Sequence, residues 1–323
     1  MKYALGLFLV VSFLQLSGQT TDGETKLRLQ PADTSRGWTP GGMFGLGFTQ
    51  SSLTNWAAGG QNSIAINGLT SLFARYRKEK YSWENTFDAG YGILRQGKNA
   101  SFTKTDDKVD FMSKFGLAAS SKWNYAILLN CKTQLTPGFH LPDDSVRISE
   151  FLSPAYVLGA IGMDFKPNPH FDFFIAPATT KITIVGNQDL ANAGAFGVDS
   201  ATYDTAGNII AGGKNARTEF GGYLRIFFSK NNFTREILKN VTLTTKLDLF
   251  VNYLENTKHV DVNWEALIAW KVNKYISMTL TTHLIYDHDI NIGKDTNDDN
   301  VPDEFGPRIQ FKEIFGAGLL YKF

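Results

Sequence analysis

The feature that most constrains this chain is an alternation of apolar and polar side chains over residues 241–272. In the first part, the odd positions from Val241 to Tyr253 are mostly apolar, and the even positions between them are mostly polar. After a polar turn at 256–259, the same alternation covers residues 260–272. A period of two is the signature of a β-strand with two chemically different faces. The segment therefore predicts a hairpin of two long strands.

The length of these strands favours a membrane. Strands of soluble proteins usually have about five or six residues, whereas about 9 to 11 tilted residues cross a bilayer, and each run here is longer than either. Tyr253, Trp264 and Trp270 stand toward the ends of the apolar face, where a girdle of aromatic rings would meet the membrane interface. The hairpin alone leaves a soluble sandwich open, but recurrence of the pattern along the chain favours a barrel.

Further strands follow from the same alternation. They are expected near residues 43–49, 63–76, 81–93, 109–117 and 123–135, in a segment ending at 165, and near 171–184, 219–228, 276–287 and 309–323. Connections after the even-numbered strands are mostly short and most others are long, as in a barrel with both termini in the periplasm. The sequence therefore predicts an all-β chain, a transmembrane antiparallel up-and-down β-barrel of about twelve strands, with about ten or fourteen as alternatives. Pro177 predicts a bulge or an edge-like irregularity in its strand.

The N-terminus and the composition agree with an outer-membrane location. Lys2 and the apolar run after it resemble a secretory signal peptide that is cleaved near Gly18 or Gln19. Beyond it, no stretch reaches the roughly 18 consecutive apolar residues of a spanning helix. The net charge is +1, so no broad field attracts nucleic acid. The predicted organisation is a signal peptide at 1–19, a periplasmic N-terminal segment at 20–41 and a barrel at 42–323, in the outer membrane of a Gram-negative bacterium.

The C-terminal segment carries a second membrane signal. Leu319, Tyr321 and Phe323 alternate with other residues, and the sequence stops on an aromatic ring. This ending resembles the insertion signal of bacterial outer-membrane barrels. The expected partners are outer-membrane lipid, the barrel insertion machinery through the strand that ends in Phe323, and surface proteins that contact the long loops. No nucleic-acid partner is expected.

A short block at 52–60 reads Ser-Leu-Thr-Asn-Trp-Ala-Ala-Gly-Gly and follows the first Phe- and Gly-rich strand. This block resembles an outer-membrane barrel family of unknown function. The resemblance implies a fold and a location for most of the chain, but it implies no activity and no catalytic residues. Trp56 within the block is interpreted as part of the turn between two strands, with a rim anchor or a lumen gate as alternatives.

Residues 295–303 form a candidate calcium loop. Oxygen-bearing side chains occupy positions 1, 3, 5 and 9 of this loop, as Asp295, Asn297, Asp299 and Asp303. A tight turn converges such alternate side chains on one hard cation. Asn300 replaces the usual Gly, and Gly306 stands where Glu is usual, so the affinity would suffer. Calcium is the one cofactor considered, and a solvated acidic loop is the alternative.

Charged side chains also recur on the strand face opposite the apolar stripe. In a barrel this face lines the lumen, where charge costs little, whereas one Lys at mid-depth on the lipid face would cost roughly 2 to 4 kcal/mol. Because both signs are interspersed, a polar passage and a narrow lumen filled with ion pairs both remain open. The predicted lumen residues are Glu84, Asp88, Asp110, Lys114, Lys132, Asp164, Glu219, Arg225, Lys246, Asp248, Asp261, Glu265 and Lys271.

Three functions fit these features. The first is a porin-like channel or passive conduit for small polar solutes, and the second is a non-transporting structural or assembly-partner barrel that acts through extracellular loops at 186–214 and 288–306. The third is a surface hydrolase built on Asp287, His288 and Asp289 near the outer rim. No Ser stands at a spacing from those three residues that would indicate a catalytic nucleophile. We therefore predict the conduit and expect no enzymatic activity.

Overall fold

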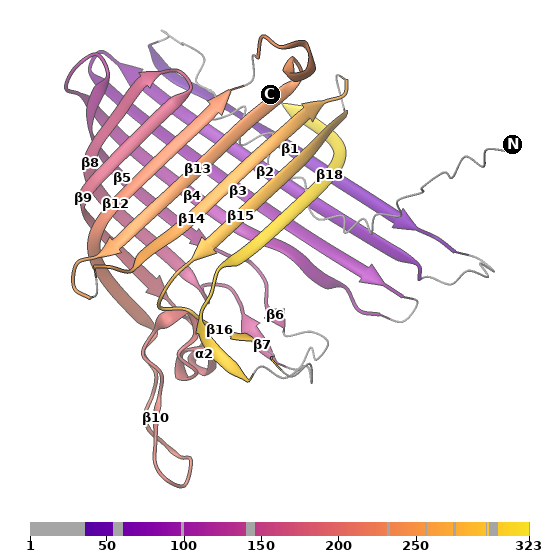
Figure 1. Cartoon of the computed structure of the whole chain (residues 1–323), viewed down its shortest axis with the longest axis vertical. Coiled ribbons are helices and arrows are strands. Elements are labelled where there is room, and N and C mark those ends of the chain that lie inside the picture. The colour runs from indigo at the N-terminus through magenta and orange to yellow at the C-terminus, as the bar shows by residue number, and fades with distance from the viewer. Residues whose placement is uncertain are drawn as a thin grey trace, which may run out of the picture.

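The computed structural model describes residues 36–53, 61–97, 100–139, 146–230, 233–255, 257–273, 276–294, 296 and 303–322. Within these residues, twelve long strands close into one antiparallel barrel (Figure 1). They are β1 (Gly37–Ser51), β2 (Ser63–Lys78), β3 (Tyr81–Gln96), β4 (Thr103–Ala118), β5 (Trp123–Thr133), β8 (Ala155–Asn168), β9 (Phe171–Ile184), β12 (Ala216–Lys230), β13 (Val241–Asn252), β14 (Val260–Lys271), β15 (Ile276–Tyr286) and β18 (Gln310–Lys322). Each barrel strand pairs with the next one along the chain, and β18 closes on β1. The predicted fold and strand number are confirmed.

Long and short connections are sorted to opposite ends of the barrel. The turns at 79–80, 119–122 and 169–170 lie at one end, called here the short-turn end. The opposite, long-loop end carries the smaller elements, which Figure 1 shows below the barrel. These are β6 (Gly138–Phe139), β7 (Arg147–Ser149), α2 (Gln188–Asn192), η1 (Ala195–Gly197), β10 (Thr202–Tyr203), β11 (Ile209–Ala211), β16 (Asn291–Lys294) and β17 (Glu304–Pro307), while η2 (Glu236–Leu238) connects β12 to β13. Among the described residues, no helix is both long enough and apolar enough to cross a bilayer.

The two faces of the strands are buried in the opposite sense to those of a soluble protein. In β13, the side chains of Lys246 and Asp248 point into the lumen and are 3% and 8% exposed. On β5, by contrast, the outward side chains of Tyr125 and Ile127 are 58% and 55% exposed. Water favours apolar residues inside a protein, whereas a bilayer favours an apolar outer belt around a polar lumen. The faces predicted from the alternation are therefore observed.

Aromatic rings surround the short-turn end of the barrel. Trp38 of β1 packs against Tyr76 of β2 and Trp83 of β3, with ring centroids 5.3 and 5.5 Å apart. Further pairs around the same end are Tyr81 with Phe115, Trp123 with Phe165, and Phe171 with Phe228. Rings of this kind prefer the membrane interface, where one edge meets water and the body meets lipid. The girdle thus marks one boundary of the apolar belt.

Three strand details differ from the expectation or refine it. β1 begins at Gly37 rather than at Met43, because residues 37–42 pair continuously with 72–77 of β2; residues 37–41 are thus strand and not a separate periplasmic segment. At Pro177, the pairing of β9 shifts register against both β8 and β12, which confirms the predicted bulge. The signal peptide at 1–19, residues 20–35, Trp56 and Phe323 lie outside the described residues.

Candidate functional site in the barrel lumen

A buried ion pair occupies the middle of the lumen. The Arg225 guanidinium on β12 donates from Nε and Nη2 to the two carboxylate oxygens of Asp248 on β13, at 2.6 and 2.9 Å. The two residues face each other in the register of the strands, and Tyr223 Oη donates to the same Asp248 carboxylate at 2.8 Å. Arg225 Nη1 also reaches Met112 Sδ on β4, at 2.9 Å. A planar fork on a carboxylate is a strong, oriented contact, so this group is a fixed part of the wall.

A second group of charges lies toward the short-turn end. Lys114 Nζ on β4 is 3.0 Å from an oxygen of Asp164 and 2.9 Å from one of Asp172. Lys166 Nζ on β8 is 3.0 Å from Glu84 and 3.3 Å from both Asp164 and Asp172. Two ammonium groups therefore share three carboxylates, and the contacts join β3, β4, β8 and β9 through the lumen.

A third group lies at the long-loop end. Lys181 Nζ on β9 is 2.7 Å from Asp261, 3.2 Å from Glu219 and 3.5 Å from Asp287. Arg217 Nη2 on β12 is 2.7 Å from Asp289. Asp287 and Asp289 follow β15, so these ion pairs tie the connection after β15 to the far wall of the barrel.

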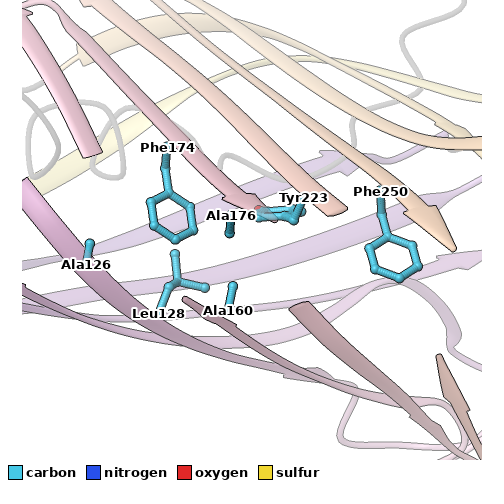
Figure 2. Packing of buried hydrophobic residues seen from close by; sticks show 7 residues of the cluster. All are labelled: Ala126, Leu128, Ala160, Phe174, Ala176, Tyr223 and Phe250. Atoms are coloured by element: carbon cyan, nitrogen blue, oxygen red, sulfur yellow. The ribbon is translucent and has the colours of Figure 1, made fainter. Parts of the chain in front are cut away.

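Apolar side chains also point into the lumen, as Figure 2 shows for seven of them. The cluster consists of Ala126, Leu128, Ala160, Phe174, Ala176, Tyr223 and Phe250, with Met112 and Leu158 packed against it. Phe174 is fully buried, and its ring lies toward Leu128 in Figure 2. An outward apolar belt does not account for these inward positions. The lumen thus has one apolar wall, formed by β5, β8, β9, β12 and β13, among otherwise polar surroundings.

One ion pair spans the full width of the barrel. Lys108 Nζ on β4 lies 3.8 Å from a carboxylate oxygen of Glu265 on β14, although five strands separate β4 from β14 in either direction. The other Glu265 oxygen is 2.8 Å from Lys246 Nζ. Side chains from opposite walls therefore meet, and the lumen is narrow at this level.

A cavity of about 360 Å³ lies between these charges and the long-loop end. Its lining includes Lys108, Lys132, Lys181, Asp248 and Glu265 from the charged walls. Apolar and aromatic side chains complete the lining, among them Tyr156, Leu158, Tyr223, Phe250 and Ile285. Its volume is in the range of small-molecule sites. Charges of both signs and an apolar wall thus face one space.

Most of the lumen residues predicted from the sequence lie where expected. Glu84, Asp88, Asp110, Lys114, Lys132, Asp164, Glu219, Arg225, Lys246, Asp248, Asp261 and Glu265 are buried or partly buried on the inner face. Lys271 is the exception, because it is exposed at the short-turn end of β14 and belongs to the mouth rather than to the interior. Two residues of this set accept hydrogen bonds from neutral side chains. Asp88 accepts one from Ser71, and Asp110 accepts one from Asn130 at 2.6 Å.

Five important lumen residues were not predicted. They are Lys108, Lys166, Asp172, Lys181 and Arg217, all of which make ion pairs in the lumen. Lys166 lies just beyond the expected strand end at 165, whereas Asp172 lies at the start of the expected strand at 171–184. Lys181 follows the bulge at Pro177, which shifts the inward face from even to odd positions. Continuing the alternation through each strand end, and reversing it at the bulge, would have found them.

The rim residues considered for a hydrolase are held by other side chains. Carboxylate oxygens of Asp261, Asp287 and Asp289 lie within 4.8 Å of one another, but Lys181 and Arg217 contact these carboxylates directly. The His288 ring stacks on His259 with centroids 3.5 Å apart. His283 Nε2 is 2.9 Å from Asn263 Oδ1. Ammonium and guanidinium groups therefore stand where a metal would have to bind.

The candidate calcium loop is described only in part. Asp303 accepts hydrogen bonds from Thr296 N at 3.1 Å and from Thr296 Oγ1 at 2.7 Å. The strands on either side, β16 and β17, pair with each other. Asp295, Asn297 and Asp299 lie outside the described residues, and calcium binding stays a prediction.

Calcium is expected to raise the midpoint of thermal unfolding of the purified chain. A ligand that binds only the folded state stabilises it, by about 2.7 kcal/mol when its concentration is a hundredfold above Kd. Circular dichroism during heating, with and without millimolar calcium, measures the effect. Magnesium in place of calcium is the control for the cation, and the Asp299→Asn variant is the control for the candidate ligand. An unchanged midpoint in calcium would leave the solvated-loop interpretation standing.

Two solved structures and one family model are similar to this chain. Among solved structures, an outer-membrane channel from Pseudomonas putida F1 is 11% identical with a TM-score of 0.38, covering 91% of this chain and 99% of that chain. The translocator domain of autotransporter NalP from Neisseria meningitidis is 10% identical with a TM-score of 0.31, covering 93% and 92%. None of the curated proteins matches the sequence significantly. Residues 48–139 match the model of a family described as "Protein of unknown function (DUF3078)". The predicted resemblance to a family of unknown function is confirmed by the DUF3078 match, which runs from the end of β1 to β6.

Proposed function

We propose that this chain is an integral outer-membrane β-barrel of a Gram-negative bacterium that conducts small polar solutes through its lumen. The observation that carries the proposal is the cavity of about 360 Å³ inside the barrel, lined by charges of both signs. Asp287 and Ile290 at the long-loop end and Asn130 and Asp248 near the middle all line it. A solute entering from the long-loop end would therefore reach the centre of the barrel through this space.

The narrow lumen restricts what could pass. Lys108 and Glu265 meet across the barrel, and the Arg225–Asp248 pair stands at the edge of the cavity that is nearer the middle of the barrel. Rings of charged side chains select solutes by charge and size. These constrictions support a conduit for small solutes with a low unit conductance, rather than a wide pore. The proposal includes no enzymatic step.

A second candidate is a non-transporting barrel that acts through its loops. The connection between β9 and β12 carries β10 and β11, which extend away from the barrel in Figure 1. Its apolar side chains are open to solvent, with Tyr203 52% and Ile210 69% exposed. Exposed apolar groups on a hairpin that projects from the barrel suit a surface-protein partner. Lipid and the insertion machinery are partners in both cases.

Planar bilayers with the reconstituted chain test the conduit directly. Discrete current steps are expected, and a Lys108→Ala variant is expected to give larger steps with a shift toward cations, because the side chain that reaches Glu265 and its positive charge are both lost. Lys78→Ala, at the exposed last residue of β2, is the matched control and should behave as the unmodified chain.

If correctly folded protein gives no current steps in repeated recordings, this result would count against conduction and favour the role that acts through the loops. Steps that Lys108→Ala leaves unchanged in size and ion preference would place the current path away from the described lumen.

A further inference from the structure

Two hydrogen-bond donors stand side by side in the cavity wall. Lys132 on β5 and Tyr156 on β8 are direct partners in the strand register, and both line the cavity. Directly opposite residues on one face have Cβ atoms about 4.5 to 5.5 Å apart. The ammonium group and the phenolic hydroxyl can therefore reach one ligand together.

These donors differ from the other charged groups of the cavity in their partners. Asp248, Asp261 and Glu265 each have a cation within 2.6 to 2.8 Å. Lys132 Nζ, by contrast, is 3.8 Å from its nearest carboxylate, that of Asp110, which is beyond hydrogen-bond distance. Within the described part of the chain, neither Lys132 Nζ nor Tyr156 Oη has a hydrogen-bond partner. The cavity thus offers a cation and a hydroxyl whose capacity to donate is not used.

The nearest carboxylates do not prevent Lys132 from attracting an anion. Asp261 and Asp287 lie on the long-loop side of the cavity, where the Lys181 ammonium group contacts both of them and offsets part of their charge. Asp110 also accepts a hydrogen bond from Asn130. An added anion would therefore meet the Lys132 ammonium group without displacing a short ion pair.

An apolar surface lies next to the two donors. Leu158 follows Tyr156 on the same face of β8, and it packs against the cluster that contains Tyr223 and Phe250. All three side chains line the cavity. Apolar walls with a few oriented polar groups are typical of small-molecule sites. A ligand that suits this space has a charged head and an apolar body.

We infer that the lumen cavity binds a small amphipathic carboxylate, with its carboxylate between Lys132 and Tyr156 and its apolar body on Leu158, Tyr223 and Phe250. The inference rests on the proposed conduit and names the class of solute that it carries. Lys132 supplies a charge-assisted hydrogen bond to the carboxylate, and Tyr156 supplies a neutral one.

Equilibrium dialysis of the purified full-length chain in detergent tests the inference, with micelles alone as the blank. The probes are phenylacetate and hexanoate, compared with 2-phenylethanol and phenethylamine, which keep the aromatic body and replace the carboxylate. At least one carboxylate is expected to bind more tightly than both comparison compounds. Lys132→Met is expected to weaken its binding about 10- to 100-fold and Tyr156→Phe about 2- to 10-fold.

Lys271→Met is the matched control, because Lys271 is exposed at the opposite mouth of the barrel, and it should bind as the unmodified chain does. Tyr156→Phe removes one hydroxyl and keeps the ring, so it tests the site even where Lys132→Met folds poorly. Carboxylates that bind no better than the alcohol and the amine, or binding that neither cavity variant weakens, would overturn the inference. Conduction without such binding refutes only the solute class, whereas binding without conduction refutes only the conduit.

Discussion

An Asp248→Ala variant is expected to unfold with a free energy about 3 to 5 kcal/mol lower than that of the unmodified chain. The substitution removes both acceptors of the Arg225 fork, at 2.6 and 2.9 Å, and the acceptor of the Tyr223 hydroxyl. Arg225 is 8% exposed, so its charge would stay buried without a carboxylate. Most of the cost comes from this uncompensated charge rather than from the loss of the pair itself.

Urea unfolding in detergent, followed by tryptophan fluorescence, measures this change. A double variant, Arg225→Met with Asp248→Leu, should recover much of the lost stability, because no charge is then left unpaired. The exposed pair of Lys214 and Asp199 has the same N–O distance, 2.6 Å, and Asp199→Ala should give no measurable change. Equal losses for the two pairs would mean that water solvates Arg225 in the lumen as it does a surface residue.

The barrel itself could be predicted because its physical signal is local. In β13, Lys246 and Asp248 alternate with leucines, and a period of two assigns each side chain to a face without any knowledge of its partner. Burial then confirms that the charged face is the inner one. The sorting of short and long connections could also be predicted locally, because short polar turns such as that at 79–80 mark the strand ends in the sequence.

The apolar wall of the lumen could not be predicted in this way. Leu128, Phe174 and Phe250 point inward, so the alternation weakens where both faces of a strand are apolar. β8 shows the effect most clearly, because Val157 and Leu158 are apolar neighbours on opposite faces. Which apolar residue meets lipid and which meets the lumen then depends on register, and register is set by neighbouring strands.

Contacts across the lumen could not be predicted from the sequence either. Lys108 meets Glu265 from the opposite wall, and Lys132 stands beside Tyr156. Strand tilt and stagger fix such meetings once the barrel closes. The sequence predicted twelve of the charged residues that face inward, but it could not predict which of them pair closely and which, like Lys132, have only a distant partner.

An Ile127→Lys variant is expected to lose about 2 to 4 kcal/mol of stability in a bilayer or in detergent. Ile127 lies near the middle of β5 (Trp123–Thr133) and points outward, with 55% of its side chain exposed. In lipid, that position is the most costly place for an ammonium group, because the charge must lose its water or deform the bilayer. The equivalent change on the surface of a soluble protein would cost little.

Urea titration of the barrel folded into liposomes measures the effect, and Ile210→Lys is the matched control. Ile210 is more exposed still, at 69%, but it lies on β11 (Ile209–Ala211), in the hairpin beyond the long-loop end, where water surrounds it on a membrane-spanning barrel. The same substitution should therefore change stability by less than about 0.5 kcal/mol there. Both side chains are more than half exposed, so in water the substitution would cost little at either position, and contact with lipid is what separates these two isoleucines. Equal tolerance of both substitutions, or a purified chain that stays soluble without detergent, would mean that the outer belt faces water.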